Sequence, residues 1–284
     1  LEIVVAHETA HQWWYATLAN DEANEPWLDE AFAEYSQILY TEWVYGIDRA
    51  RKVFDYWIRR PYLSYLATHK DLPANMSVWY YDTSYEYYRT IYNKGAYILH
   101  MLRQVMGDKK FFKLLNKWYL SYQFKFARIR DFIKMAEEVY GGDLDWFFNA
   151  WLFSSGIPRY VILDAEARPT LTGHSIKVTI VQIEPKNRII PVVIPVLIST
   201  SEGNYVFRIL VNGTGKLSNI IIAGVPKCVV LDPYNDVLRI DEQKNKVVFT
   251  IIGEEAESIL PYIILTTFYA FTGLLLARVL KRPK

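Results

Sequence analysis

Two histidines and a glutamate stand together near the start of the sequence, in the pattern His7-Glu8-Thr9-Ala10-His11. Residues four apart lie on the same face of an α-helix, so both imidazoles can reach one ion. Zinc at a catalytic site takes three protein ligands and keeps a fourth position for water, which Glu8 is placed to face. The pattern therefore favours metal-assisted hydrolysis over the alternative of two histidines on an ordinary surface helix.

A third metal ligand is expected at Glu30. Residues 12–29 separate it from His11, and this length lets a second helix fold back antiparallel to the first. The first turn of that helix would present Glu30 beside the two histidines and complete a site for one zinc ion. Glu34 lies one turn further on the same face, where it is either an acceptor for the N–H of a ligand histidine or a surface residue.

Four motifs carry a family resemblance. Residues 7–14 read HETAHQWW, residues 27–35 read WLDEAFAEY, residues 92–96 read YNKGA and residues 145–151 read DWFFNAW. Together they resemble the aminopeptidase N family of zinc metallopeptidases, whose catalytic domain is thermolysin-like. The resemblance covers residues 1–158 and implies that this stretch is the mainly helical half of such a domain.

The resemblance also implies a role for each matched residue. His7, His11 and Glu30 resemble the zinc ligands, and Glu8 resembles the general base that takes a proton from a zinc-bound water. Tyr92 resembles the family's phenol that donates a hydrogen bond to the oxyanion formed when the water attacks a peptide carbonyl. The substrates would then be peptides, and the reaction the removal of their N-terminal residues.

Two departures from the family pattern leave alternatives open. Asp29 stands where the family usually has asparagine, which places an extra carboxylate near the metal. The Gly-x-Met-Glu-Asn strand that holds the free α-amine of a substrate does not occur in these 284 residues, so either it lies in an upstream part of the protein or the enzyme is not strictly an aminopeptidase. The alternatives are an endopeptidase or an epoxide hydrolase on the same scaffold, or a non-catalytic, membrane-anchored peptide-binding protein.

The periodicity of apolar residues changes from helical to alternating near Pro158. It predicts helices over 1–19, 27–45, 48–67 with an interruption at Pro61, 88–106, 108–122, 129–140 and 143–153. It predicts strands over 175–184, 189–198, 205–211, 220–223, 227–231 and 237–240. We therefore expect a multidomain chain in which the catalytic half-domain of residues 1–158 is followed by an all-β sandwich over residues 159–245.

The end of the sequence is apolar. Residues 258–277 form twenty positions without a charge, enough for a helix of about 30 Å, which is the thickness of a bilayer core. We expect an acidic linker over 246–257 and a transmembrane helix over 258–280 with a basic tail to 284. The basic tail predicts a single-pass membrane protein with its C-terminus in the cytoplasm and its catalytic domain outside it. The alternative is a buried helix of a larger fold.

Composition limits the other functions. A formal net charge of +1 gives no electrostatic basis for nucleic-acid binding. The one cysteine, Cys228, allows no disulfide within the chain, and its apolar neighbours predict a buried strand thiol.

Overall fold

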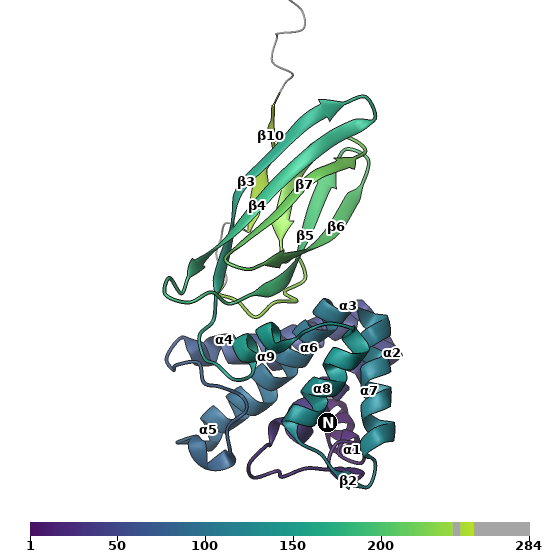
Figure 1. Ribbon diagram of the computed structural model, residues 1–284, viewed down its shortest axis with the longest axis vertical. Helices are drawn as coiled ribbons and strands as arrows, with labels where there is room; N and C mark the ends of the chain where they lie inside the picture. Colours follow the sequence, from purple (N-terminus) through teal and green to yellow (C-terminus); the bar gives the residue numbers. More distant parts are fainter. Residues whose placement is uncertain (241–244, 253–284) are drawn as a thin grey trace, which may run out of the picture.

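The computed structural model describes residues 1–240 and 245–252 as a helical part followed by a β part (Figure 1). The helical part also holds two short parallel strands, β1 and β2. Its elements are α1 (Glu2–Ala10), β1 (Leu18–Ala19), η1 (Trp27–Ala31), α2 (Phe32–Tyr45), α3 (Ile47–Phe54), η2 (Asp55–Arg59), α4 (Arg60–Leu66), η3 (Val78–Tyr80), α5 (Ser84–Tyr87), η4 (Tyr88–Lys94), α6 (Gly95–Met106), α7 (Asp108–Tyr122), β2 (Lys125–Phe126), α8 (Ile129–Tyr140) and α9 (Asp145–Trp151).

The first helix is shorter than the sequence predicts. Periodicity indicates a helix over 1–19, but α1 ends at Ala10 and the chain turns. The turn lets the indole of Trp14 pack on Phe32 and donate a hydrogen bond to Ser36 Oγ at 2.9 Å. Tertiary packing against α2 thus overrides the local helical pattern.

Three of the helical segments, η1, η2 and η4, are wide π-helical turns that run directly into α-helices. The predicted break at Pro61 is absent, because Pro61 lies in the first turn of α4, where a missing backbone N–H is tolerated. The π-helical turns η1 and η4 carry Glu30 and Tyr92. Such turns are rare and occur frequently at functional sites.

The β part consists of two four-stranded sheets (Figure 1). Many of their aliphatic side chains are buried. One sheet has the order β10-β3-β4-β7 and the other β6-β5-β8-β9. All neighbours are antiparallel except β10 and β3. The strands are β3 (Arg159–Thr170), β4 (Gly173–Glu184), β5 (Val192–Thr200), β6 (Asn204–Val211), β7 (Thr214–Ile222), β8 (Pro226–Leu231), β9 (Lys246–Val248) and β10 (Thr250–Ile251).

Two segments of the β part differ from the prediction. Strand β3 was not predicted from the sequence, although alternate residues along it are buried. The predicted strand over 237–240 is instead an irregular segment, because the carboxylate of Asp232 accepts the backbone N–H groups of Asp236 and Val237 and holds them in a turn. The sheets also extend into the predicted linker, since β9 and β10 lie within residues 246–251.

The predicted fold class, a helical half-domain, a sandwich and one transmembrane helix, is corrected by the structure. Within residues 1–240 and 245–252, no helix is both long enough and apolar enough to cross a bilayer. The described chain is a helical part followed by two β-sheets. The predicted helix over 258–280 lies outside the described residues. The location that we inferred from it is untested.

The two parts meet along α6 and α9. The Tyr97 hydroxyl donates hydrogen bonds to the backbone carbonyls of Asn235 at 2.6 Å and Val237 at 3.1 Å. Further along α6, His100 Nε2 lies 3.0 Å from Asp236 Oδ1. The indole of Trp151 at the end of α9 donates to the carbonyl of Pro191 at 2.9 Å. Hydrogen bonds at several separate points therefore join the helices to the sheets.

A buried ion pair lies just after Tyr92 in the sequence. Lys94, whose side chain is 1% exposed, is 2.9 Å from Asp71 and also donates to the carbonyls of Leu72 and Ser154 at 2.6 and 3.2 Å. Asp71 accepts further hydrogen bonds from the Tyr62 hydroxyl and from the backbone of Gly156. The pair therefore joins η4 to the segment that leads into the β part.

Replacing Lys94 with methionine should lower the free energy of unfolding by about 3–5 kcal/mol, because Asp71 then remains buried without a cation. Chemical denaturation of the full chain measures this. The matched control is Lys117→Met, which removes the exposed pair of Lys117 with Glu138 (2.6 Å) and should change stability little. Equal losses in the two variants would contradict the structural role of the buried pair.

Candidate metal centre

Three of the predicted ligand atoms converge on one point. Nε2 of His7, on α1, lies 3.2 Å from Nε2 of His11, which follows the last turn of that helix. Oε2 of Glu30, on η1, lies 3.4 Å from each of the two nitrogens. The structure thus brings together the three residues that the sequence predicts as metal ligands.

Hydrogen bonds on the far side of each imidazole determine where its proton lies. Nδ1 of His7 is 3.1 Å from Oε2 of Glu34, and Nδ1 of His11 is 3.1 Å from the backbone carbonyl of Trp14. A carboxylate and a carbonyl both accept, so each neutral ring carries its proton on Nδ1. In this neutral form, which metal binding requires, both Nε2 atoms present lone pairs toward Glu30.

These atoms fit a zinc ion. Three lone pairs facing one another repel unless a cation lies between them, and Oε2 of Glu30 is buried without a hydrogen-bond partner among the described residues. Zinc bonds to nitrogen and oxygen are about 2.0–2.2 Å long, which separates neighbouring ligands of a tetrahedral ion by about 3.3–3.6 Å. The observed 3.2–3.4 Å matches that separation within 0.1 Å.

The charges around the ligands favour a cation as well. Burial lowers the pKa of His7, but its contacts with the Glu30 and Glu34 carboxylates outweigh burial and raise the pKa to about 9. The Glu30 contact likewise raises the pKa of His11. Burial would raise the pKa of Glu30, yet its contacts with His11, His7 and the Tyr92 hydroxyl lower the pKa to about 2. A site that stabilises protons on its bases this strongly also stabilises a bound metal ion.

Tyr92 lies against the metal site. Its ring stacks on that of His7, with centroids 5.7 Å apart and planes 6° from parallel. Its hydroxyl is within hydrogen-bonding reach of the Glu30 carboxylate. Burial and that carboxylate raise the pKa of Tyr92 well above its ordinary value. The phenol is therefore protonated throughout the physiological range and acts as a hydrogen-bond donor.

Gly95 allows η4 and η1 to approach closely enough for this contact. A Cβ atom at Gly95 would lie 2.6 Å from Cβ of Ala31 and 3.0 Å from the Trp27 ring. Both distances are shorter than a carbon–carbon contact, so any side chain would push the helices apart. The glycine of the YNKGA motif thus has a packing role that keeps Tyr92 beside Glu30.

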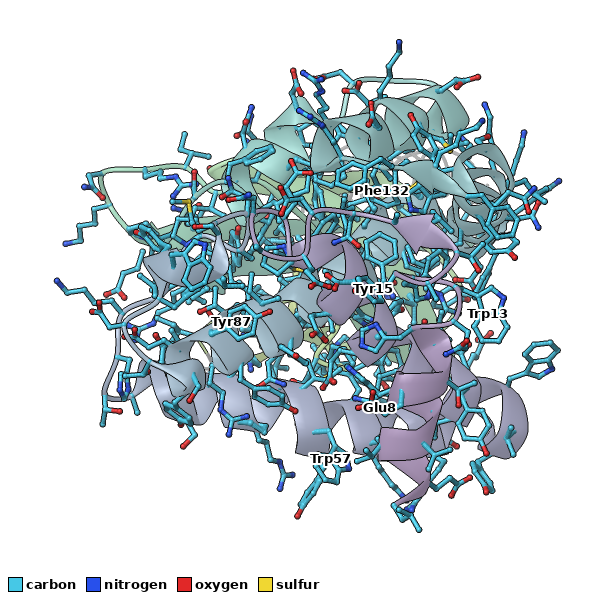
Figure 2. The ribbon with its side chains drawn as sticks, turned by 90° about the horizontal axis from the view of Figure 1, so that it is seen from below. Glu8, Trp13, Tyr15, Trp57, Tyr87 and Phe132 are labelled. Carbon is cyan, nitrogen blue, oxygen red and sulfur yellow. The ribbon has the colours of Figure 1, made fainter. Side chains whose placement is uncertain are left out.

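Glu8 lies next to the metal site with its side chain exposed. It lines a cavity of about 360 Å³ together with the three ligand residues and Tyr92. Figure 2 shows Glu8 on α1 at the same side of the helical part as Trp57, which also lines this cavity. Glu8 therefore faces the space in which a substrate would meet the metal.

Asp29, the departure from the family pattern, contributes less charge than expected. Its side chain is buried and accepts a hydrogen bond from Asn20 at 3.2 Å. Burial and the neighbouring charge of Glu30 raise the pKa of Asp29 to about 7. This carboxyl is therefore only partly ionised at neutral pH.

A larger hollow of about 1180 Å³ lies against another face of α1. It is lined mainly by apolar side chains, among them Trp13, Trp43 and Phe112. None of the metal-binding residues lines it. The three ligand residues therefore line the smaller cavity and not this hollow.

Sequence reasoning missed four features of the site. The Trp14 carbonyl could not be foreseen because α1 was expected to continue past it. Gln37 and Trp57 give no motif signal, although both line the cavity. Tyr88, one helical turn before Tyr92, belongs to none of the four motifs.

Comparison with known proteins identifies the family of the helical part. The Peptidase family M1 domain model matches residues 1–151. Aminopeptidase N of Lactococcus lactis subsp. lactis is 28% identical over 162 residues, which are 55% of this chain and 19% of that protein. Aminopeptidase N of Streptomyces lividans is 26% identical over 159 residues, 54% of this chain and 18% of that protein. The matched region is therefore about a fifth of the length of these relatives.

A solved structure shares the fold across both parts. The crystal structure of Legionella pneumophila aminopeptidase A in complex with aspartic acid superposes with a TM-score of 0.58 at 20% identity. The superposition covers 84% of this chain and 27% of that one. Because the family model matches more than half of the chain, including every residue of the site, the chain belongs to peptidase family M1, a family of zinc metallopeptidases.

Proposed function

We propose that this chain carries the catalytic centre of an aminopeptidase that binds one zinc ion through His7, His11 and Glu30. The observation that supports it most strongly is that Nε2 of His7, Nε2 of His11 and Oε2 of Glu30 lie within 3.4 Å of one another, while an acceptor faces Nδ1 of each imidazole. The names of the relatives, aminopeptidase N and aminopeptidase A, favour removal of N-terminal residues over cleavage within a chain.

The bound zinc would lower the pKa of a water molecule toward 7 and polarise the peptide carbonyl. Glu8 faces the cavity and takes the proton from the attacking water, then delivers it to the leaving amine. The Tyr92 hydroxyl donates a hydrogen bond to the oxyanion that develops on the carbonyl. Glu34 and the Trp14 carbonyl hold the two imidazoles in the orientation and tautomer that metal binding needs.

Metal analysis tests the ligand set. The full chain should bind one zinc ion, and His11→Gln should lose it, because only two ligands remain. His69 is exposed and lines a different cavity from the metal ligands, so His69→Gln is the matched control and should retain zinc. Zinc content equal in both variants would contradict the assignment.

Peptide substrates with free and blocked N-termini test the reaction. An aminopeptidase cleaves Leu-Ala-Ala but not its N-acetylated form, because it needs the free α-amine. Cleavage of the blocked peptide would instead indicate an endopeptidase. Hydrolysis of neither by the zinc-loaded full-length protein would overturn the proposal.

A further inference from the structure

The cavity beside the metal site extends beyond the catalytic groups. Besides the metal ligands, Glu8 and Tyr92, it is lined by Glu34 and Gln37 of α2, Ile3 and Val4 of α1, Trp57 of η2 and Tyr88 of η4. Nothing in the proposed chemistry uses Gln37, Trp57 or Tyr88. The chemical character of these three side chains therefore indicates which part of a substrate the cavity accepts.

Only one of the two carboxylate oxygens of Glu34 contacts His7. Oε2 lies 3.1 Å from Nδ1 of His7, whereas Oε1 is buried without a hydrogen-bond partner among the described residues. The residue is only 3% exposed, and a buried carboxylate oxygen without a donor is unfavourable. Gln37, also 3% exposed, lies one helical turn away and lines the same cavity with its amide-bearing side chain.

The charge of the cavity is negative. Three carboxylates line it, from Glu8, Glu30 and Glu34, and of the described residues no lysine or arginine does. One divalent ion on the metal ligands still leaves a net negative charge. A low-dielectric cavity of this sign favours a cationic group of a substrate.

The rest of the lining suits the stem of a long cationic side chain. Ile3 and Val4 supply an apolar wall, along which the methylene groups of lysine or arginine can pack. Trp57 is 42% exposed and Tyr88 offers a second aromatic ring. The faces of both aromatic rings attract ammonium and guanidinium groups.

We propose that this part of the cavity is a subsite for the side chain of a lysine or arginine next to the scissile bond, bound by Glu34 and Gln37 in the space that Trp57 and Tyr88 also line. The inference rests on the proposed peptidase function and names its substrate class. His7 turns Nε2 toward the metal position and Nδ1 toward Glu34, so Glu34 lies a ring's width further from the scissile bond. An α-ammonium stays close to the scissile carbonyl, whereas the lysine ammonium ends a flexible four-carbon stem that spans this distance.

Four tripeptides test the subsite in the zinc-loaded full chain. Ala-Lys-Ala is compared with Ala-norleucine-Ala, and Lys-Ala-Ala with norleucine-Ala-Ala, because norleucine keeps the stem and lacks the charge. In one of the two pairs kcat/KM should favour lysine by about tenfold or more, as expected for a hydrogen bond to a charged group. The pair that shows the preference tells which side of the scissile bond the subsite serves.

Two substitutions assign the preference to its residues. Glu34→Gln keeps an acceptor for His7 and removes the charge, so the lysine-to-norleucine ratio should fall toward one. This ratio is independent of any general loss of activity. Gln37→Met touches no metal ligand and should lower the ratio at least about threefold.

The outcomes are distinct. Ratios near one in both pairs of the unsubstituted chain, or ratios unchanged in both variants, overturn the subsite. Equal losses for lysine and norleucine peptides in Glu34→Gln also overturn it, since they place the α-ammonium or the metal at Glu34 instead. If none of the four peptides is cleaved, the result contradicts the proposed peptidase function itself.

Discussion

Replacing Glu8 with glutamine should lower kcat for peptide hydrolysis by about 10²–10⁴-fold while zinc remains bound. The amide keeps the size of the side chain but cannot take a proton from water, and general base catalysis contributes a factor of this order. Glu8 is exposed and is not one of the three converging ligand atoms, so its loss leaves the metal site intact. Stopped assays with saturating peptide, together with zinc analysis of the same sample, measure both quantities.

A control and a contradictory outcome define this test. Glu202, an exposed residue in a turn of the β part, provides the same charge change far from the site, and Glu202→Gln should retain full activity. Full activity in Glu8→Gln would show that another group takes the proton. Loss of zinc in Glu8→Gln would mean that Glu8 contributes to metal binding.

Replacing Tyr92 with phenylalanine should lower kcat by about 10²–10³-fold, which corresponds to a barrier higher by about 2.7–4 kcal/mol. The ring that stacks on His7 is retained, and only the hydroxyl is lost. Because burial keeps the phenol protonated, the lost group is a hydrogen-bond donor at every working pH. KM should change little, since the bond to the oxyanion forms in the transition state.

Tyr85→Phe is the matched control for Tyr92, because Tyr85 is exposed and lies on α5, away from the metal ligands. It should leave kcat unchanged. A Tyr92→Phe variant with normal kcat and raised KM would mean that the hydroxyl binds the substrate in its ground state. A fall in zinc content would instead assign the effect to the contact with Glu30.

The ligand set was predictable because its geometry is local. His7 and His11 are one helical turn apart, and the motif around Glu30 places it at the start of the next helix. Tyr92 needed the resemblance, since periodicity alone does not distinguish it from 21 other tyrosines. Gly95 belonged to the same motif, but its reason, a close approach to Ala31, appears only in the packed structure.

The remaining features depend on contacts between segments far apart in the sequence. The end of α1 is set by packing of Trp14 on Phe32, which outweighs the helical pattern of residues 11–19. Trp57 and Gln37 line the cavity because η2 and α2 pass near α1, and no spacing in the sequence records this. Residues 237–240 read as a strand, yet Asp232 holds their start in a turn through its side chain.

The junction between the two parts has a consequence for motion. Tyr97 and His100 on α6, and Trp151 at the end of α9, bond to different segments of the β part. A rigid-body swing of the sheets about the connecting segment would break bonds at all three places at once. Hinge opening between the two parts is therefore opposed. Of the described residues, only those of the helical part line the cavity, and the exposed Trp57 and Tyr88 side chains at it can change rotamer without breaking any of these bonds.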